Sequence, residues 1–464
     1  MQQKKKALLN ISRKTFIEVT VLLAALLLVS IVLTYVVPRG SFGLLPDGQP
    51  DYLSYTRRND LSGIPVWKGL LAPVLVFFSS DGLTLAVLSV FLLVISASFQ
   101  VMEDAGGIRA LVGAVARRFG GRRLLLLVLL AFLFYCFGAF LGLFEEMLTM
   151  LPIIVSLCVL LGYDAFTGFL CCILACGMGF ATAITNPFTV LLASEIIGVS
   201  PMVNIWFRLI IFAVVFLLLL AYILLYASRT AKMPAASPQE AFAEAEDPVR
   251  ERRTRRIYAL FLTAALLVIV AASVLPPLQG LAVPVLAVYF LVFGILAGCA
   301  AAGSLRQVLR SFGHGFVSAL PTIVFIALSG SIKYVFEQGS ILPTIAHSIT
   351  TAASGHSAFA VALMIYLIVL VLEFFISSST AKAILVMGIL TVVQVGLSKE
   401  MLVLIYTFAD GYTNMLFPTS PVLLISLSMI EKDYFTWLKR SWPLFLANTL
   451  LVVLFLAAGI AVGY

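Results

Sequence analysis

Charge is scarce in this sequence, and its scarcity excludes a water-soluble domain. Only 11% of the 464 residues are Asp, Glu, Lys or Arg, whereas 62% are hydrophobic, and the mean hydropathy is +1.10. About ten stretches are apolar over roughly 17 residues or more, which is enough for a helix to cross a hydrocarbon core ~30 Å thick. The composition therefore predicts an all-α polytopic membrane protein.

Metal-ligating patterns are also missing. The sequence has only three histidines and six cysteines, with no P-loop and no zinc-ligand spacing. All six cysteines lie in apolar segments, so no extracellular disulfide framework is indicated. Cys172 and Cys176 are one helical turn apart, but without a nearby histidine or a second cysteine pair their spacing favours small-residue packing. We expect no metal site and no cofactor apart from Na⁺ or H⁺ as a coupling ion.

Positive charge is confined to a few short segments. The net charge is +8, and the basic clusters are Lys4 to Lys6 with Arg13 and Lys14, Arg109 to Arg123, Arg250 to Arg256, Arg306 with Arg310, and Lys439 with Arg440. Short loops rich in Lys and Arg stay cytoplasmic. A single assignment of inward and outward membrane crossings places every basic cluster on that side. The charge thus predicts a cytoplasmic N-terminus rather than binding to nucleic acid.

The apolar segments divide into spans and surface helices. Phe16–Val37 is too long for a signal-peptide core and is interpreted as the first span. Further spans are expected at Leu83–Met102, Ile205–Tyr226, Ile257–Leu275, Ala282–Ala300, Leu320–Phe336 and Trp442–Val462. Ile108–Phe119 and Leu342–Ala353 suit helices that lie along the membrane surface. The turn-rich segment Pro38–Lys68 is expected to be an external loop.

Two further blocks, about 124–161 and about 361–395, are too long for single spans and carry polar residues in their middle. If both ends of a block lie on one side of the membrane, the block is a re-entrant helical hairpin. Each block is followed by an apolar segment, about 166–197 and about 401–429, that is interrupted by Thr, Asn, Ser and Pro. Broken helices are tolerated in a membrane only where protein or water satisfies the freed backbone groups. Two matched breaks predict a substrate site near the midplane.

The order surface helix, hairpin, broken helix and closing span occurs twice, with opposite polarity. We therefore predict an inverted-topology repeat in which residues 1–227 form the first copy and residues 257–464 the second. Residues 228–256 are rich in Ala, Pro, Glu and Arg, which is typical of a flexible cytoplasmic linker.

The first break offers Thr185, Asn186 and Pro187 as candidate site residues. The Thr and Asn side chains suit a cation or a substrate amide, and the proline removes a backbone donor and keeps the helix open. The next half-helix presents its positive dipole end to an anion. The alternative interpretation is a proline kink that the two polar side chains stabilise.

The second break offers Asp410, Asn414, Thr419 and Ser420. Asp410 and Asn414 share a helix face because they are four residues apart. Asp410 suits a substrate ammonium, Na⁺ or a proton, and its alternative role is a structural ion pair with Lys382.

The two hairpin tips supply the remaining candidates. Glu145 and Glu146 lie at the first tip, and if both face a dry cavity, repulsion and desolvation should keep one of them protonated. The alternative is a solvated pair at a wet tip. The second tip carries the hydroxyls of Ser377, Ser378, Ser379 and Thr380, followed by Lys382, which suits a carboxylate. A Ser-Lys nucleophile is the enzymatic alternative, but no orienting group accompanies it, so we expect no enzyme.

The same residues resemble the C4-dicarboxylate anaerobic carrier family, in particular the branch often labelled basic amino acid antiporters, within the ion-transporter superfamily. The matching stretches are Phe144 to Met147 with Leu151-Pro152, Gly162 to Asp164, Gly177 to Phe180, Asn186 to Val190, Ser377 to Lys382, Asp410 to Asn414 and Pro418 to Pro421. The resemblance implies a carrier in the cytoplasmic (inner) membrane, with a scaffold that commonly dimerises and a mobile domain built from the hairpins and broken helices. Related sodium–dicarboxylate carriers have Ser-Asn-Thr triplets at the tips, from which both tips here depart.

We therefore expect a secondary active transporter of a small charged metabolite, an amino acid or a carboxylate, that works by ion-coupled or exchange alternating access. An amino acid is favoured because the Glu pair suits a cationic group while Lys382 and the half-helix N-termini suit a carboxylate. A C4-dicarboxylate carrier or an ion channel are the alternatives. The expected partners are the substrate, the lipid bilayer and a second copy of the chain, and not nucleic acid.

Overall fold

A computed structural model describes residues 13–46, 50–58, 62–119, 122–231, 248–275, 278, 281–352, 356–376, 379–392 and 396–464. Within these ranges, nine helices are long and apolar enough to cross a membrane. The prediction of an all-α polytopic membrane protein is confirmed.

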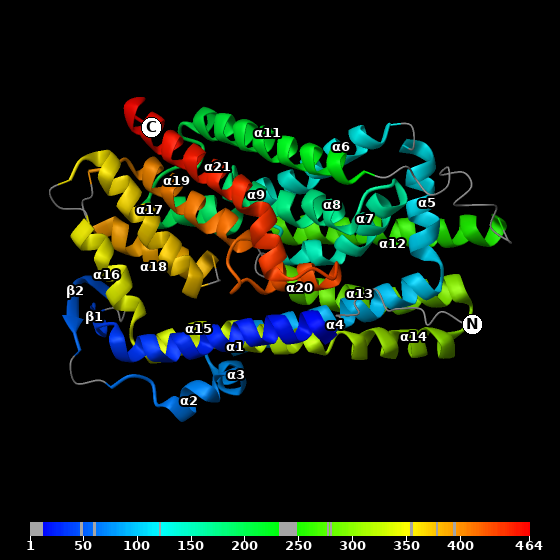
Figure 1. Cartoon of the computed structure of the whole chain (residues 1–464), viewed down its shortest axis with the longest axis horizontal. Coiled ribbons are helices and arrows are strands. Elements are labelled where there is room, and N and C mark those ends of the chain that lie inside the picture. The colour runs from blue at the N-terminus through cyan, green and yellow to red at the C-terminus, as the bar shows by residue number, and fades with distance from the viewer. Residues whose placement is uncertain are drawn as a thin grey trace.

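The helices form two groups that lie one below the other in Figure 1. The lower group contains α1 (Arg13–Val36), α2 (Val66–Leu70), α3 (Ala72–Leu75), α4 (Gly82–Asp104), α13 (Ala282–Ala302), α14 (Leu305–Ser318) and α15 (Pro321–Gln338). In this group α4 packs against α13 and α14, and α1 packs against α15. Small residues allow close contact: a Cβ on Gly315 would lie 2.7 Å from the Cα of Ala97. Apolar helices in a bilayer associate through such close approaches.

The upper group contains the segments on which the predicted site depends. It comprises α6 (Arg123–Cys136), η3 (Phe137–Leu141), η4 (Glu145–Thr149), α7 (Leu151–Leu160), α8 (Ala165–Phe169), η5 (Leu170–Leu174), α9 (Ala175–Ala181), η6 (Pro187–Leu191), α10 (Leu192–Ile197) and α11 (Ile205–Thr230). From the second half of the chain come α17 (Ala358–Phe375), α18 (Ser379–Val392), α19 (Lys399–Gly411), η8 (Tyr412–Met415), α20 (Pro421–Met429) and α21 (Tyr434–Ala461). The predicted surface helices are α5 (Gly107–Phe119) and α16 (Leu342–Ala352).

Both over-long blocks fold as helical hairpins. In the first, the chain turns at Gly142, whose φ of 68° is in the left-handed region that favours glycine. The guanidinium of Arg123, at the start of this block, lies 5.7 Å from the ring centre of Tyr163 just beyond its end, so the two ends of the block are neighbours. In the second, the ammonium of Lys382 contacts the carboxylate of Glu373 across the tip.

Both predicted breaks are present, and they meet. α9 ends at Ala181 and η6 begins at Pro187, while regular helix stops at Gly411 and resumes at Pro421. A Cβ on Gly411 would lie 1.9 Å from the Cα of Ala181, so that only a glycine allows the ends of the two half-helices to touch. The order of elements therefore agrees with the sequence analysis, whereas the inverted symmetry of the two halves stays a prediction.

Two segments differ from the sequence interpretation. The loop expected between Pro38 and Lys68 contains an antiparallel pair of strands, β1 (Gly40–Leu44) and β2 (Pro50–Arg57). The ring of Tyr55 on β2 stacks on the ring of His347 of α16, with 4.1 Å between the ring centres. No local sequence pattern predicts this contact. In addition, α12 (Pro248–Val274) begins inside the stretch interpreted as the linker, because residues 248–256 extend the following span as helix. Residues 232–247 lie outside the described residues.

Candidate functional site

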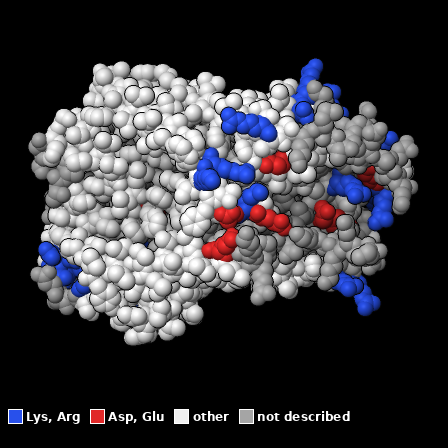
Figure 2. Space-filling view, viewed as in Figure 1, with Lys and Arg blue, Asp and Glu red and all other residues white. Residues whose placement is uncertain are grey.

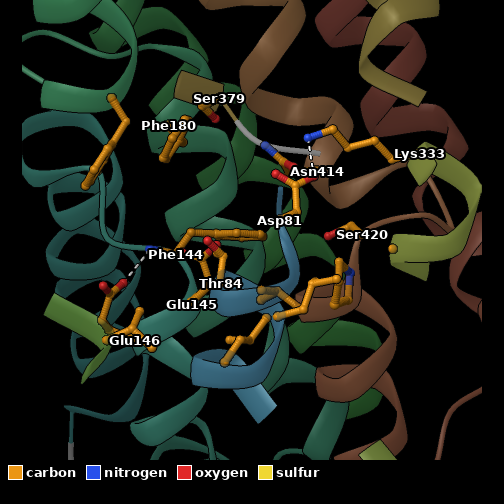
Figure 3. Close-up of a pocket in the computed structure, with 18 residues that line it drawn as sticks. Asp81, Thr84, Phe144, Glu145, Glu146, Phe180, Lys333, Ser379, Asn414 and Ser420 are labelled. Carbon is orange, nitrogen blue, oxygen red and sulfur yellow. Dashed lines mark hydrogen bonds and ion pairs between the residues drawn. The ribbon is translucent and has the colours of Figure 1, made fainter. Parts of the chain in front are cut away.

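A cavity of about 300 Å³ lies between the lower and upper groups. The lower group contributes Asp81, Thr84, Leu85 and Leu88 at the start of α4, Val283 of α13, and Gly330 and Lys333 of α15. The upper group contributes both hairpin tips, α9, η6 and the second break, through Gly142, Phe144, Glu145, Glu146, Phe180, Phe188, Ser379, Asn414, Ser420, Pro421 and Val422. Figure 3 shows these side chains around the space that they enclose.

The first tip brings two adjacent carboxylates to the cavity wall. Glu145 and Glu146 begin the short 3-10 helix η4, and both line the cavity. Glu146 is only 4% exposed, and its Oε2 accepts a hydrogen bond of 3.2 Å from the backbone N–H of Phe144. Glu145 is more exposed than its neighbour. Glu146 is therefore bonded to the backbone of its own tip and Glu145 is the more accessible of the two, and both border the cavity.

The polar residues of the first break face the hairpin rather than the cavity. The Asn186 amide donates a hydrogen bond of 3.2 Å to the carbonyl of Gly138, and its Oδ1 accepts one of 2.9 Å from the N–H of Phe188. The Thr185 hydroxyl donates to the carbonyl of Phe140 at 3.1 Å. Thr185, Asn186 and Pro187 are not among the residues that line the cavity. Their described contacts are those of the alternative interpretation, in which the two polar side chains stabilise the break.

At the second break the side chains are divided between the cavity and the protein. Asn414 and Ser420 line the cavity, and the Asn414 amide donates to the backbone carbonyl of Asp410 at 3.0 Å. Thr419 is buried, and its carbonyl accepts a hydrogen bond from Ser329 of α15. The freed carbonyl of Met415 accepts from the indole N–H of Trp437 at 2.8 Å. The unwound backbone thus finds protein partners, as a membrane interior requires.

Behind the second tip lies a buried ionic cluster. The Lys382 Nζ lies 2.7 Å from Oδ1 of Asp410 and also contacts Glu373, and all three residues are buried. The Ser379 hydroxyl donates to Oδ2 of Asp410 at 2.9 Å. Lys382 is therefore paired inside the protein, which corrects the expectation that it attracts a substrate carboxylate. The alternative role of Asp410, an ion pair with Lys382, is the one that the geometry shows.

The other candidates of the second tip are placed only in part. Ser379 lines the cavity. Thr380 lies in the first turn of α18, and nothing is described of its side chain. Ser377 and Ser378 lie outside the described residues.

Comparison with known sequences decides the family. The sequence model of the C4-dicarboxylate anaerobic carrier family, DcuC, matches residues 16–461. The chain belongs to the C4-dicarboxylate anaerobic carrier family. It is accordingly a secondary transporter that spans the membrane several times.

Two similar proteins are known from bacteria. The chain is 29% identical over 422 residues to the protein named "Putative basic amino acid antiporter YfcC" of Escherichia coli strain K12, covering 84% of this chain and 81% of that protein. It is 26% identical over 383 residues to an uncharacterized protein of Haemophilus influenzae, covering 78% of this chain and 74% of that protein.

Among solved structures, the carrier is similar to the YdaH transporter of Alcanivorax borkumensis, with 18% identity and a TM-score of 0.46 over 96% of this chain and 99% of that one. It is also similar to MtrF of Neisseria gonorrhoeae, described as an antimetabolite efflux pump, with 14% identity and a TM-score of 0.44 over 95% of this chain and 94% of that one.

Sequence reasoning missed the charged residues that the carrier's lower group brings to the cavity. Lys333 of α15 contacts Asp81, which directly precedes α4, and it lies 3.3 Å from the carboxylate of Glu337. Lys333 was detectable as the single basic residue within the apolar segment Leu320–Phe336, since ionisable residues within a span are functional candidates. Its pairing with Asp81, 252 residues away, had no signal in the sequence.

Proposed function

We propose that this carrier moves a small amino acid across the cytoplasmic membrane by alternating access, driven by exchange or by H⁺ or Na⁺. The observation that carries the proposal is the charge of the cavity wall. Asp81, Glu145 and Glu146 are acidic, and Lys333 is the one basic residue among the described residues that line the cavity. A ligand with an ammonium group and a carboxylate satisfies both signs.

The position of the cavity supports alternating access. The cavity lies between two groups of helices. The upper group contributes to its wall mainly through the hairpin tips and the second break. Side-chain and backbone groups that are freed from regular helix at such points are the usual substrate ligands of secondary transporters. A volume of about 300 Å³ is at the small end of the range for pockets that hold small molecules.

A C4-dicarboxylate is the second candidate, because the family takes its name from such substrates. Three carboxylates in the cavity wall oppose it, since like charges in a site of low dielectric repel strongly. The name of the similar Escherichia coli protein, a basic amino acid antiporter, agrees with the first candidate.

The charge pattern supports a cytoplasmic N-terminus. On the face shown in Figure 2, Lys and Arg gather over the part of the molecule that contains α5, α12 and α14. These helices carry the clusters Arg117 with Arg118, Arg250 to Arg256, and Arg306 with Arg310. Basic segments of this kind stay on the cytoplasmic side. We place the chain in the inner membrane with this end inside, as a carrier without enzymatic activity or an organic cofactor, and as a homodimer.

Uptake into proteoliposomes tests the function. Labelled L-lysine or L-alanine should enter with saturable kinetics and faster when the same amino acid is loaded inside, and succinate should compete poorly. Asn414→Ala should lower uptake at least tenfold because it removes an amide from the cavity wall. The control is Asn204→Gly, which removes an exposed asparagine whose φ of 52° suits glycine. Saturable uptake of succinate without uptake of either amino acid would favour the dicarboxylate, and non-saturating flux would favour a channel.

A further inference from the structure

Lys333 supplies the positive charge of the cavity, and it does so from the lower group. Its side chain is 11% exposed and it lies on α15. The wall opposite, contributed by the upper group, includes Ser379, Asn414 and Ser420. α15 also reaches the second break directly, because Ser329 donates a hydrogen bond to the carbonyl of Thr419. Lys333 is therefore placed where the two groups of helices face each other.

The partner of Lys333 is a carboxylate that itself lines the cavity. Asp81 contacts the Lys333 ammonium through Oδ2 and is 34% exposed. Its side chain does not cap α4, the helix that it precedes. Figure 3 shows this pair beside Asn414, apart from Glu146 at the first tip. The carboxylate of Asp81 thus occupies the position next to Lys333 that the carboxylate of a substrate would need.

We propose that Lys333 binds the substrate carboxylate and that Asp81 is the internal carboxylate for which the substrate is exchanged. The inference rests on the proposed transport of a carboxylate-bearing substrate. A mostly buried ammonium without a counter-charge is strongly unfavourable. Lys333 therefore keeps a carboxylate partner both when the cavity is empty and when the substrate is bound. Glu337, at 3.3 Å, remains beside it while the other partner changes.

This arrangement joins the two groups of helices through the substrate. The carboxylate is held by Lys333 of the lower group, and the ammonium end faces Glu145 and Glu146 of the upper group. An empty cavity leaves Lys333 paired within the lower group alone, since Asp81 and Glu337 both belong to it. Substrate occupancy and the contact between the groups are therefore coupled.

A purely structural ion pair predicts a different response to mutation. If the pair only stabilises the fold, Lys333→Gln and Asp81→Asn should both weaken ligand binding or leave it unchanged. If Asp81 competes with the substrate, the two changes should have opposite effects. Lys333→Gln removes the carboxylate ligand, whereas Asp81→Asn removes the competitor and leaves Glu337 to balance the charge of Lys333.

Binding to the purified full-length protein tests this with matched ligands. The affinity for L-lysine is compared with that for 1,5-diaminopentane, and the affinity for L-alanine with that for ethylamine. Each amine lacks only the carboxylate of its amino acid. Succinate is the fifth probe. Lys333→Gln should weaken amino acid binding at least tenfold and leave amine binding within twofold, and Lys333→Arg should recover part of the loss. Asp81→Asn should tighten amino acid binding about threefold or more. Lys68→Gln, which removes a lysine bonded to Gln338 at the end of the same helix, is the control.

The outcomes separate the two proposals. If the wild type binds an amino acid and Lys333→Gln still prefers it to the amine, or Asp81→Asn weakens binding, the role of Lys333 is overturned and amino acid transport stands. If the wild type binds succinate and neither amino acid, amino acid transport is overturned, and loss of succinate binding in Lys333→Gln still supports Lys333 as the carboxylate ligand. A wild type that binds none of the probes overturns both.

Discussion

At the scale of residues, the charged groups of this carrier fall into two classes that the sequence does not distinguish. Glu373, Lys382 and Asp410 form a closed ionic cluster, while Glu145 and Lys333 face the cavity. The difference lies in what surrounds each group. None of the three members of the closed cluster lines the cavity, so their ion pairs hold elements together. Lys333 and its partner Asp81 both line the cavity, where a substrate carboxylate competes with Asp81 for the ammonium.

The closed cluster should dominate local stability. Lys382→Met leaves the carboxylates of Glu373 and Asp410 buried without their shared cation, which should cost about 3–5 kcal/mol. We expect a large fall in the thermal unfolding temperature in detergent, whereas Lys399→Met, at an exposed site where the lysine bonds the carbonyl of Gly198, should have little effect. Neutralising the partners as well, with Glu373→Gln and Asp410→Asn, should restore most of the stability. An unchanged unfolding temperature in Lys382→Met would show that the cluster is not the buried triad described.

The glutamates at the first tip should carry the coupling proton if the carrier uses one. Glu146→Gln imitates the protonated carboxyl permanently, so exchange of substrate should continue while accumulation driven by a pH gradient is lost. Uptake into proteoliposomes with and without an inside-alkaline gradient measures this, and Glu145→Gln is the paired variant. If both variants respond to the gradient like the wild type, neither glutamate carries the proton.

At the scale of elements, the breaks are stable because other helices satisfy them. Trp437 and Tyr434 of α21 donate to the carbonyls of Met415 and Leu416 at 2.8 Å each. At the first break, Asn186 and Thr185 bind carbonyls of η3 instead. In a membrane, where no bulk water reaches the backbone, these bonds decide that the unwound segments persist.

The contact between the breaks should tolerate no side chain. In Gly411→Ala the new Cβ would lie 1.9 Å from the Cα of Ala181, and since this neighbour is backbone, one half-helix must move. Overpacking of this kind costs about 1–3 kcal/mol, and transport should fall with it. Gly313→Ala in α14 is the control because nothing lies within 4 Å of its Cβ position. Equal unfolding temperatures and uptake in the two variants would contradict the contact.

At the scale of the whole molecule, the cavity belongs to neither group of helices alone. Its walls come from α4, α13 and α15 on one side and from the hairpin tips and the second break on the other. A relative movement of the two groups would therefore change access to every ligand at once. This is the requirement of alternating access, and the predicted inverted repeat would supply its two equivalent states.

Accessibility of the cavity should change sides during transport. Thr84 also lines the cavity. In a variant that lacks the six native cysteines, Thr84→Cys should react with an impermeant maleimide from either side of the membrane, and bound substrate should slow the reaction. Turnover with substrate on both sides should raise labelling from the less reactive side. A channel would instead react from both sides at once, with no effect of substrate on the ratio.

The sequence alone determined the class of protein, most of the spans, both hairpins and both breaks. These features are local. The length of an apolar run decides whether that run can cross the membrane, and Thr, Asn or Pro within it decide where its helix is interrupted. The same reasoning placed Glu145, Glu146, Ser379, Asn414 and Ser420 near a common site, and all five line the cavity. The strand pair β1–β2 and the helical start of α12 were missed because their stability comes from distant partners or from the continuation of a span.

The tertiary structure decided which way each polar group points. Asn186 and Thr185 bind the neighbouring hairpin, and Lys382 is paired with Glu373 and Asp410. The polar side chains of the first break and the Lys382 ammonium therefore do not line the cavity. Lys333 and Asp81 supply it instead, although 252 residues separate them. The membrane imposes on every segment the same demand, that polar groups find partners, and only packing determines whether the partner is another part of the chain or the substrate.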